Sequence, residues 1–239
     1  MFPQSVNPSV EMSRDAGLAY LISVANEPRE PPMPAAWMPP ANTRALIFDC
    51  DGTLADTMPI HYRAWSRILA PRGIPFDEVR FYQLGGMPTG KIIRVLSNET
   101  GVPVADADIE VLIHEKESIF LSLLHEVEPL AGIVGIAERF RGQLPMAVAS
   151  GGYRDVVRRT LDAIGIRDWF DAMVCAEDTA NHKPEPDVFL EAAVRLGNIP
   201  ADVCVVFEDT DIGLEAARRA GMMGVDVRAW APVRMWANP

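Results

Sequence analysis

The chain has 239 residues, of which 49% are hydrophobic and 23% are charged, and its formal net charge at pH 7 is −11. This length suits one domain with a sizeable insertion or two modest domains, and the composition excludes a chain that is disordered or fibrous throughout. Because nucleic acids and anionic membranes reward clustered Lys and Arg, the excess of acids argues against both as the main partner.

Residues 1–43 contain eight of the twenty prolines, a density that disfavours regular helices and strands. We therefore predict a flexible leader over this segment. Its apolar run at 16–25 is too short to span a bilayer and is preceded by acids rather than by the arginines of a targeting peptide. Three cysteines without a C-x-x-C pair, Cys50, Cys175 and Cys204, are expected to be buried thiols in a reducing compartment. A cytoplasmic location is expected.

Five apolar runs of strand length follow the leader, and helical patterns separate most of them. The runs are 45–49, 145–150, 172–176, 203–207 and 224–227, and the helical patterns are 155–164, 187–196 and 212–220. Strands that alternate with helices of this length predict an α/β fold with a Rossmann-like, doubly wound parallel sheet. Ligands bind beyond the carboxyl ends of the strands in such sheets, and the polar residues of this chain cluster there.

One spacing in this pattern is too long for a simple crossover. Ser150 follows Asp49 by 101 positions, whereas a strand, its crossover and the next strand need only about 30 residues. The sequence between Pro59 and His125 is helical in pattern. We predict a small all-α cap over residues 58–128, inserted after the first strand, and an α/β core formed by 44–57 and 129–239. Such a cap can close over the strand ends and exclude water.

The first predicted strand ends in Asp49, and Asp51 and Gly52 follow directly. Gly52 lets the backbone approach a ligand closely. Two neighbouring carboxylates repel each other unless a divalent cation lies between them or one is protonated. Both conditions suit phosphoryl transfer, in which one carboxylate attacks phosphorus and the other acts as acid and then base. Taken alone, these residues are also typical of an Asx turn after a strand.

Polar groups also follow the second and third predicted strands. Ser150 and Gly151 offer a hydroxyl and backbone N–H groups that can bind phosphoryl oxygens, although a glycine turn with a helix cap explains them equally well. Lys183 lies on a loop restricted by two prolines and can neutralise charge on a transferring group. Taken alone, a lysine on such a loop is more often a solvated surface lysine.

The fourth predicted strand ends in acids. Glu208 and Asp209 are followed by Asp211 at the start of a helical pattern. Mg²⁺ takes oxygen ligands and keeps several waters, so one or two further carboxylates suffice to hold it. Acids also favour a helix N-terminus, which accounts for Asp211 but hardly for all three.

These four signals, in this order and each at a strand end, resemble the haloacid dehalogenase superfamily over residues 45–228. The resemblance implies the following roles: Asp49 as nucleophile, Asp51 as general acid and base, Ser150 and Lys183 as clamps on the phosphoryl group, and Glu208 and Asp209 as metal-binding acids. It implies Mg²⁺ as cofactor, with a carboxylate oxygen of Asp49 and the backbone carbonyl of Asp51 among its ligands. A phosphatase that works through an aspartyl-phosphate is expected.

The helical insertion and the sequence His61-Tyr-Arg-Ala-Trp65 resemble the subgroup of beta-phosphoglucomutase and the sugar-phosphate phosphatases. His61 would lie near Asp51 and influence its protonation, unless it is simply an exposed helix histidine. The mutase carries an arginine in its cap loop to hold a second phosphate, whereas this chain has Thr89 there. The resemblance places further substrate contacts at Gly52, Thr57, His61, Gly86, Thr89, Lys91 and Gly151.

The cap loop is more similar to that of the fructose-1-phosphatases and 6-phosphogluconate phosphatases, so we expect hydrolysis to water. The expected substrate is fructose 1-phosphate, 6-phosphogluconate or a related hexose phosphate, and the expected state is a monomer. Two alternatives stay open, a hexose-phosphate mutase and a catalytically silent phosphosugar-binding protein. A 2-haloacid dehalogenase is disfavoured because that chemistry needs neither Asp51 nor the metal acids.

Overall fold

The structure, a computed structural model, describes residues 37–230. Within this part of the chain, the strands form one five-stranded parallel sheet in the order β3-β2-β1-β4-β5. They are β1 (Ala45–Phe48), β2 (Met146–Ala149), β3 (Ala172–Val174), β4 (Cys204–Glu208) and β5 (Met223–Asp226). The predicted α/β class with a doubly wound parallel sheet is thereby confirmed. Residues 1–36 of the predicted leader lie outside the described residues.

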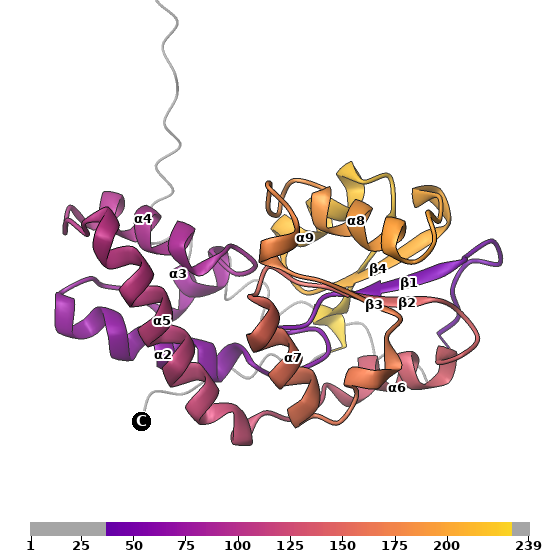
Figure 1. Cartoon of the computed structure of the whole chain (residues 1–239), viewed down its shortest axis with the longest axis horizontal. Coiled ribbons are helices and arrows are strands. Elements are labelled where there is room, and N and C mark those ends of the chain that lie inside the picture. The colour runs from indigo at the N-terminus through magenta and orange to yellow at the C-terminus, as the bar shows by residue number, and fades with distance from the viewer. Residues whose placement is uncertain (1–36, 231–239) are drawn as a thin grey trace, which may run out of the picture. The chain divides into compact units, whose positions relative to one another are not determined.

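Helices cover both faces of this sheet (Figure 1). The α-helices are α2 (Met58–Leu69), α3 (Glu78–Gln83), α4 (Thr89–Thr100), α5 (Asp106–Leu123), α6 (Ala131–Phe140), α7 (Arg154–Ala163), α8 (Asp187–Arg195) and α9 (Asp211–Arg219). Short 3₁₀ turns are found at Ala70–Arg72, Leu124–Glu126, Arg167–Trp169, Ala176–Asp178, Ala201–Val203 and Val227–Ala229. Helices α8 and α9 lie over one face of the sheet, and α6 and α7 lie over the other. None of the helices in the described part of the chain has the length and apolar character needed to cross a membrane.

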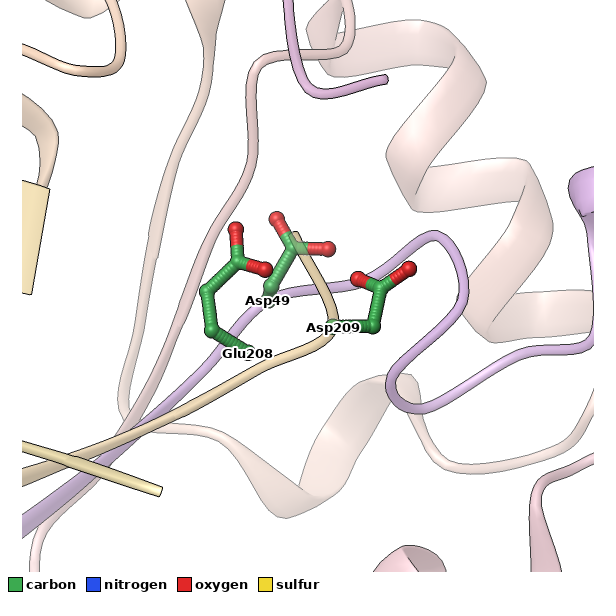
Figure 2. A group of neighbouring side chains, drawn as sticks. All are labelled: Asp49, Glu208 and Asp209. Carbon is green, nitrogen blue, oxygen red and sulfur yellow. The ribbon is translucent and has the colours of Figure 1, made fainter. Parts of the chain in front are cut away.

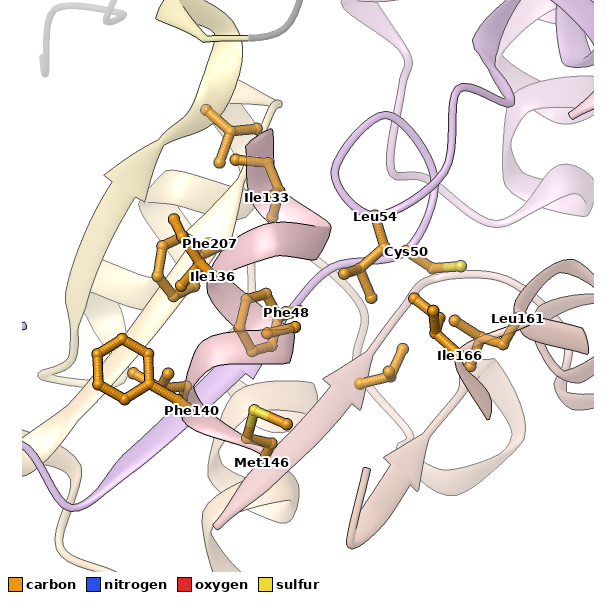
Figure 3. Packing of buried hydrophobic residues seen from close by; sticks show 14 of the residues in the cluster. Phe48, Cys50, Leu54, Ile133, Ile136, Phe140, Met146, Leu161, Ile166 and Phe207 are labelled. Atoms are coloured by element: carbon orange, nitrogen blue, oxygen red, sulfur yellow. The ribbon is translucent and has the colours of Figure 1, made fainter. Parts of the chain in front are cut away.

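Strand β1 lies at the centre of the sheet and is buried at every position, as a continuous apolar strand covered on both faces must be. Phe48 stacks on Phe207 of β4 with ring centroids 4.6 Å apart. Ile133 and Ile136 of α6 pack against the same cluster (Figure 3). This packing fixes the carboxyl ends of β1 and β4 side by side, which is where the polar residues of the sequence motifs follow.

Helices α2 to α5 have a hydrophobic cluster of their own. It is built around Trp65, Phe81, Ile93 and Leu112, one from each helix, and all four lie within the segment predicted as a cap. Most polar positions of these helices are at least partly exposed, as expected for amphipathic helices, whereas Thr89 and Lys116 are buried.

Helix α6 has no counterpart among the predicted elements. Gly132 and Gly135 lie within its ten residues, and each glycine costs about 1 kcal/mol relative to alanine in a helix, which weakens the sequence pattern. The helix forms because Ile133, Ile136 and Phe140 bury their side chains against the sheet. Tertiary packing therefore outweighs local propensity here.

Candidate active site

The turn after β1 brings Asp49 and Asp51 to the edge of the sheet. The backbone N–H of Asp49 still bonds the carbonyl of Phe207, so Asp49 keeps the register of the sheet. The chain then turns sharply at Gly52, whose φ of 82° lies in the left-handed region. A Cβ on Gly52 would lie 2.2 Å from Oδ2 of Asp209. Only glycine fits this turn, because a side chain would displace an acid that follows β4.

Three carboxylates meet at the adjacent ends of β1 and β4 (Figure 2). One carboxylate oxygen from each of Asp49, Glu208 and Asp209 lies within 4.8 Å of the others. Lys183 reaches the same point, with its Nζ 2.6 Å from Oδ1 of Asp49 and 2.7 Å from Oε1 of Glu208. The lysine is only 1% exposed, so it is a buried ion-pair partner and not a solvated surface lysine.

The charges in this cluster do not balance. Burial raises the pKa of Asp49 to about 8, and Glu208 and Asp51 add to this effect while Lys183 opposes it. Burial also raises the pKa of Asp209 well above its ordinary value, with further contributions from Glu208 and Asp49. Burial lowers the pKa of Lys183, but Asp49 and Glu208 outweigh it and hold this pKa above its ordinary range. Oxygen ligands with surplus negative charge fit a hard divalent cation such as Mg²⁺.

Glu208 is fixed in this cluster by the turn that follows it. Its Oε2 accepts a 2.7 Å bond from the backbone N–H of Thr210, and the hydroxyl of Thr210 lies 3.1 Å from the same oxygen. Gly213 makes room for the carboxylate, because a Cβ there would lie 1.8 Å from Oε1. A carboxylate held by several donors in this way cannot swing away from Asp49 and Lys183.

Asp51 has a different set of partners, although it comes from the same turn as Asp49. Its Oδ1 accepts a 2.7 Å bond from the hydroxyl of Thr57 and lies 3.2 Å from Nε2 of His61. On the other side of the ring, Nδ1 of His61 lies 2.9 Å from Nζ of Lys116. Because the ammonium of Lys116 can only donate, Nδ1 must accept, and the proton of a neutral His61 is assigned to Nε2, facing Asp51.

These contacts also shift the protonation of the pair. Burial raises the pKa of Asp51, but the charge of His61 when it is protonated, the hydrogen bonds of His61 and Thr57 and the charge of Lys116 outweigh it, and this pKa falls below its ordinary value. Burial and the charge of Lys116 lower the pKa of His61, which favours the neutral ring. Asp51 is therefore held ionised, next to a neutral imidazole that donates to it.

The loop after β2 lies against the helical segment. Ser150 is 2% exposed, and its Oγ accepts a 3.0 Å bond from the backbone N–H of Gly152. A Cβ on the intervening Gly151 would lie 2.6 Å from the backbone carbonyl oxygen of Gly86, in the loop before α4. Because Gly151 and Gly86 have no side chains, the loop after β2 and the loop between α3 and α4 can approach each other through their backbones.

A cavity of about 80 Å³ lies between these loops. Seven of the sequence-predicted site residues line it: Asp49, Asp51, His61, Gly86, Thr89, Ser150 and Gly151. Lys183, Glu208 and Asp209 group with Asp49 but do not line the cavity, and Thr57 contacts Asp51. Lys91 is exposed and is not among the lining residues.

Four further polar residues line the cavity without having been singled out in the sequence: Lys116, Glu117, Tyr153 and Thr210. Lys116 and Glu117 belong to a run of charged residues on α5, a pattern typical of a solvated helix face. A signal was nevertheless present, because Lys116 falls in helical register with the buried Leu112 and Phe120. A lysine on the apolar stripe of a helix is a candidate for a buried ionic role.

The chain is similar to proteins of known family. The model of the family described as haloacid dehalogenase-like hydrolase matches residues 46–227. The fructose-1-phosphate phosphatase YqaB of Escherichia coli K12 is 42% identical, over 77% of this chain and 95% of that protein. Beta-phosphoglucomutase of Bacillus subtilis is 31% identical, over 80% of this chain and 85% of that protein. A crystal structure of a hydrolase from Pseudomonas syringae matches with a TM-score of 0.72 at 30% identity, over 80% of this chain and 88% of that one.

Proposed function

This chain belongs to the haloacid dehalogenase-like hydrolase family, and from that premise we propose that it is a Mg²⁺-dependent phosphatase of small sugar phosphates. The observation that carries the proposal is the contrast between Asp49 and Asp51. Both carboxylates line one cavity, but Asp49 is bonded to a buried lysine among acids, whereas Asp51 is bonded to Thr57 and His61. Two carboxylates in different environments are suited to two different roles.

Asp49 is the proposed nucleophile. Lys183 bonds Oδ1, which leaves Oδ2 of Asp49 to attack phosphorus from the cavity. Asp49, Glu208 and Asp209, with the backbone carbonyl of Asp51, are the groups proposed to hold Mg²⁺. When bound, the cation would offset negative charge on these acids and on the phosphoryl oxygens.

Asp51 is the proposed general acid and base. In the first half of the reaction, the bond from Oδ2 of Asp49 to phosphorus forms, the bond from phosphorus to the sugar oxygen breaks, and Asp51 gives its proton to that oxygen. The negative charge of a bound phosphate favours protonation of Asp51 beforehand. In the second half, Asp51 takes a proton from water, the bond from the water oxygen to phosphorus forms, and the bond from phosphorus to Oδ2 of Asp49 breaks, which releases inorganic phosphate and restores the carboxylate.

The similarity to a fructose-1-phosphate phosphatase supports fructose 1-phosphate or a related hexose phosphate as the substrate, with 6-phosphogluconate as another member of this class. The similarity to beta-phosphoglucomutase makes a hexose-phosphate mutase the second candidate. The structure favours hydrolysis, because the hydroxyl of Thr89 bonds the carboxylate of Glu117, 2.8 Å away, on the cap side of the cavity. An anionic group there does not suit the second phosphate that a mutase retains.

The proposal is tested by a screen for phosphate release from hexose 1-phosphates, fructose 1-phosphate, hexose 6-phosphates and 6-phosphogluconate, with and without Mg²⁺. The variant Asp49→Asn should lower turnover by at least about a thousandfold while circular dichroism shows the fold retained. The exposed Asp155, on α7, does not line the cavity and bonds Arg158 and Arg159, so Asp155→Asn removes the same charge and should retain full activity.

Three outcomes would contradict the proposal. Near-normal turnover by Asp49→Asn would exclude Asp49 as nucleophile. Return of labelled phosphate to a second position of the sugar, without release to solution, would indicate the mutase. Binding of phosphosugars without cleavage of any of them, or of p-nitrophenyl phosphate, would indicate a silent binding protein.

A further inference from the structure

The wall of the cavity that faces the active-site turn is formed partly by α5, which contributes Lys116 and Glu117. The ammonium of Lys116 lies 3.1 and 3.2 Å from the two carboxylate oxygens of Glu117. It also contacts the rings of Trp65 and Phe120, with 5.7 and 5.4 Å between Nζ and the ring centroids. Its side chain is 4% exposed and that of Glu117 is 13% exposed. The pair is therefore held in a fixed and largely dry position.

Glu117 has acceptor capacity to spare. A carboxylate offers about four acceptor positions, and Thr89 and Lys116 together occupy three of them. Thr89 bonds Oε1, so Oε2 has Lys116 as its partner and room for one more donor. Because Glu117 lines the cavity, a hydroxyl group of a bound sugar is a suitable donor.

The charged residues that line the cavity also disfavour a second anionic group on the substrate. Among the described residues that line it, Lys116 and His61 are the only members of the set Lys, Arg and His. Three carboxylates line it as well, those of Asp49, Asp51 and Glu117. Lys116 is already engaged by Glu117 and by Nδ1 of His61, and Nε2 of His61 lies 3.2 Å from Oδ1 of Asp51. No cation on this wall is left over for a second anionic group of a substrate.

We propose that Glu117 is a specificity-determining residue, which accepts a hydrogen bond from the uncharged part of a sugar monophosphate and disfavours substrates that carry a second negative charge. The inference rests on the proposed phosphatase function and narrows its substrate class. The physical reason is that like charges in a water-poor cavity repel strongly, whereas a sugar hydroxyl offers the carboxylate a donor. Fructose 1-phosphate belongs to the favoured class, and 6-phosphogluconate, with its carboxylate, to the disfavoured one.

The test compares the wild type with Glu117→Gln and Glu110→Gln. Glu110 is an exposed acid seven residues earlier on the same face of α5, so its variant removes the same charge outside the cavity. For each protein, kcat/KM is measured with fructose 1-phosphate, 6-phosphogluconate and p-nitrophenyl phosphate. Glu117→Gln should raise the ratio of 6-phosphogluconate to fructose 1-phosphate by about tenfold, because it removes the repulsion and frees Lys116 to pair with an anion. Glu110→Gln should leave this ratio unchanged, and kcat/KM for p-nitrophenyl phosphate, which has neither sugar hydroxyls nor a second anionic group, measures the effect of each variant on the basal reaction.

A second readout separates this inference from the proposed function. Fructose 1-phosphate and 6-phosphogluconate are titrated calorimetrically into the Asp49→Asn protein and into the double variant that also carries Glu117→Gln. Neither protein is expected to turn over its ligand. The ratio of the two Kd values should shift between the proteins by the same factor of about ten. Absence of sugar hydrolysis in the wild type, together with this shift, would overturn the proposed function and support the inference. An unchanged ratio in both measurements would overturn the inference and leave the phosphatase intact.

Discussion

The candidate active site contains two buried lysines, and they lie in opposite electrostatic settings. Lys183 is 1% exposed and bonds Asp49 and Glu208, next to a third acid, Asp209. Lys116 is 3% exposed and contacts one carboxylate, that of Glu117, together with a histidine and two aromatic rings.

The difference indicates that one side of the cavity is suited to phosphoryl transfer and the other to selecting the substrate. On the core side, negative charge exceeds positive charge, which suits a site that takes up a cation and a phosphoryl group. On the side formed by α2, α4 and α5, Lys116 is already paired with Glu117, so this wall discriminates through hydrogen bonds and through the repulsion between Glu117 and a second anionic group. Removing either lysine tests whether the two sides differ in this way.

The largest contrast is expected in stability. In the metal-free protein at about pH 9, Lys183→Met should lower the free energy of unfolding by about 3–5 kcal/mol, because it leaves several buried carboxylates without a counter-charge. Lys116→Met should cost about 1–2 kcal/mol, since Glu117 keeps its bond from Thr89. Urea denaturation monitored by circular dichroism measures both values. Equal losses for the two variants would show that the two lysines are electrostatically equivalent.

A second contrast concerns how closely each side is packed. Gly52→Ala places a methyl group against the carboxylate of Asp209 at a backbone angle that alanine rarely adopts, and it should lower kcat/KM by about tenfold or more and weaken Mg²⁺ binding. Gly90→Ala, in α4, approaches the end of the Ile113 side chain at 3.1 Å and Cγ2 of Ile109 at 3.5 Å, and should change kcat/KM by less than about twofold. Kinetics at several Mg²⁺ concentrations measure both effects. A larger loss for Gly90→Ala would contradict the contrast.

The smallest effect is expected in the pH dependence of metal binding. The pKa of Asp49 is raised in the folded protein to about 8 from an ordinary value near 3.8. Its contribution to the stability of the metal-free protein is therefore complete below about pH 4 and is lost as pH rises through about 8. Mg²⁺ competes with these protons, so it should raise Tm by a few degrees more at about pH 9 than at about pH 6.

Differential scanning fluorimetry at the two pH values measures this difference. Glu117→Gln should show the same pH dependence as the wild type, because its charge lies on the cap side and not among the proposed metal ligands. An equal Mg²⁺ shift at both pH values would mean that protons do not compete with the cation at the acid cluster.

The sequence predicts the residues at the ends of the strands, such as Asp49 and Glu208, far better than those on the helical side of the cavity, Lys116 and Glu117. Asp49 and Glu208 lie at the ends of continuous apolar runs, and the rule that parallel strands end at one edge brings them together. Lys116 and Glu117 lie in the middle of a long helix, where no strand end marks them and their neighbours are charged. Their contact with His61 and Thr89 depends on how α2, α4 and α5 pack, which a local pattern does not contain.

The same reason explains the other differences between prediction and structure. Lys183 is typical of an exposed lysine until the positions of Asp49 and Glu208 are known, because its burial depends on partners far away in the sequence. Helix α6 carries two glycines that hide its periodicity, and only its packing on the sheet stabilises it. The burial of Lys183 and the stability of α6 therefore depend on long-range contacts that a local sequence pattern does not contain.

Gly151 shows that a residue without a side chain can determine one of these long-range contacts. Its missing side chain lets the loop after β2 rest on the carbonyl of Gly86. A methyl group there would lie 2.6 Å from this carbonyl oxygen and would force the two loops apart. The close approach of the two loops that border the cavity thus depends on a residue that has no side chain.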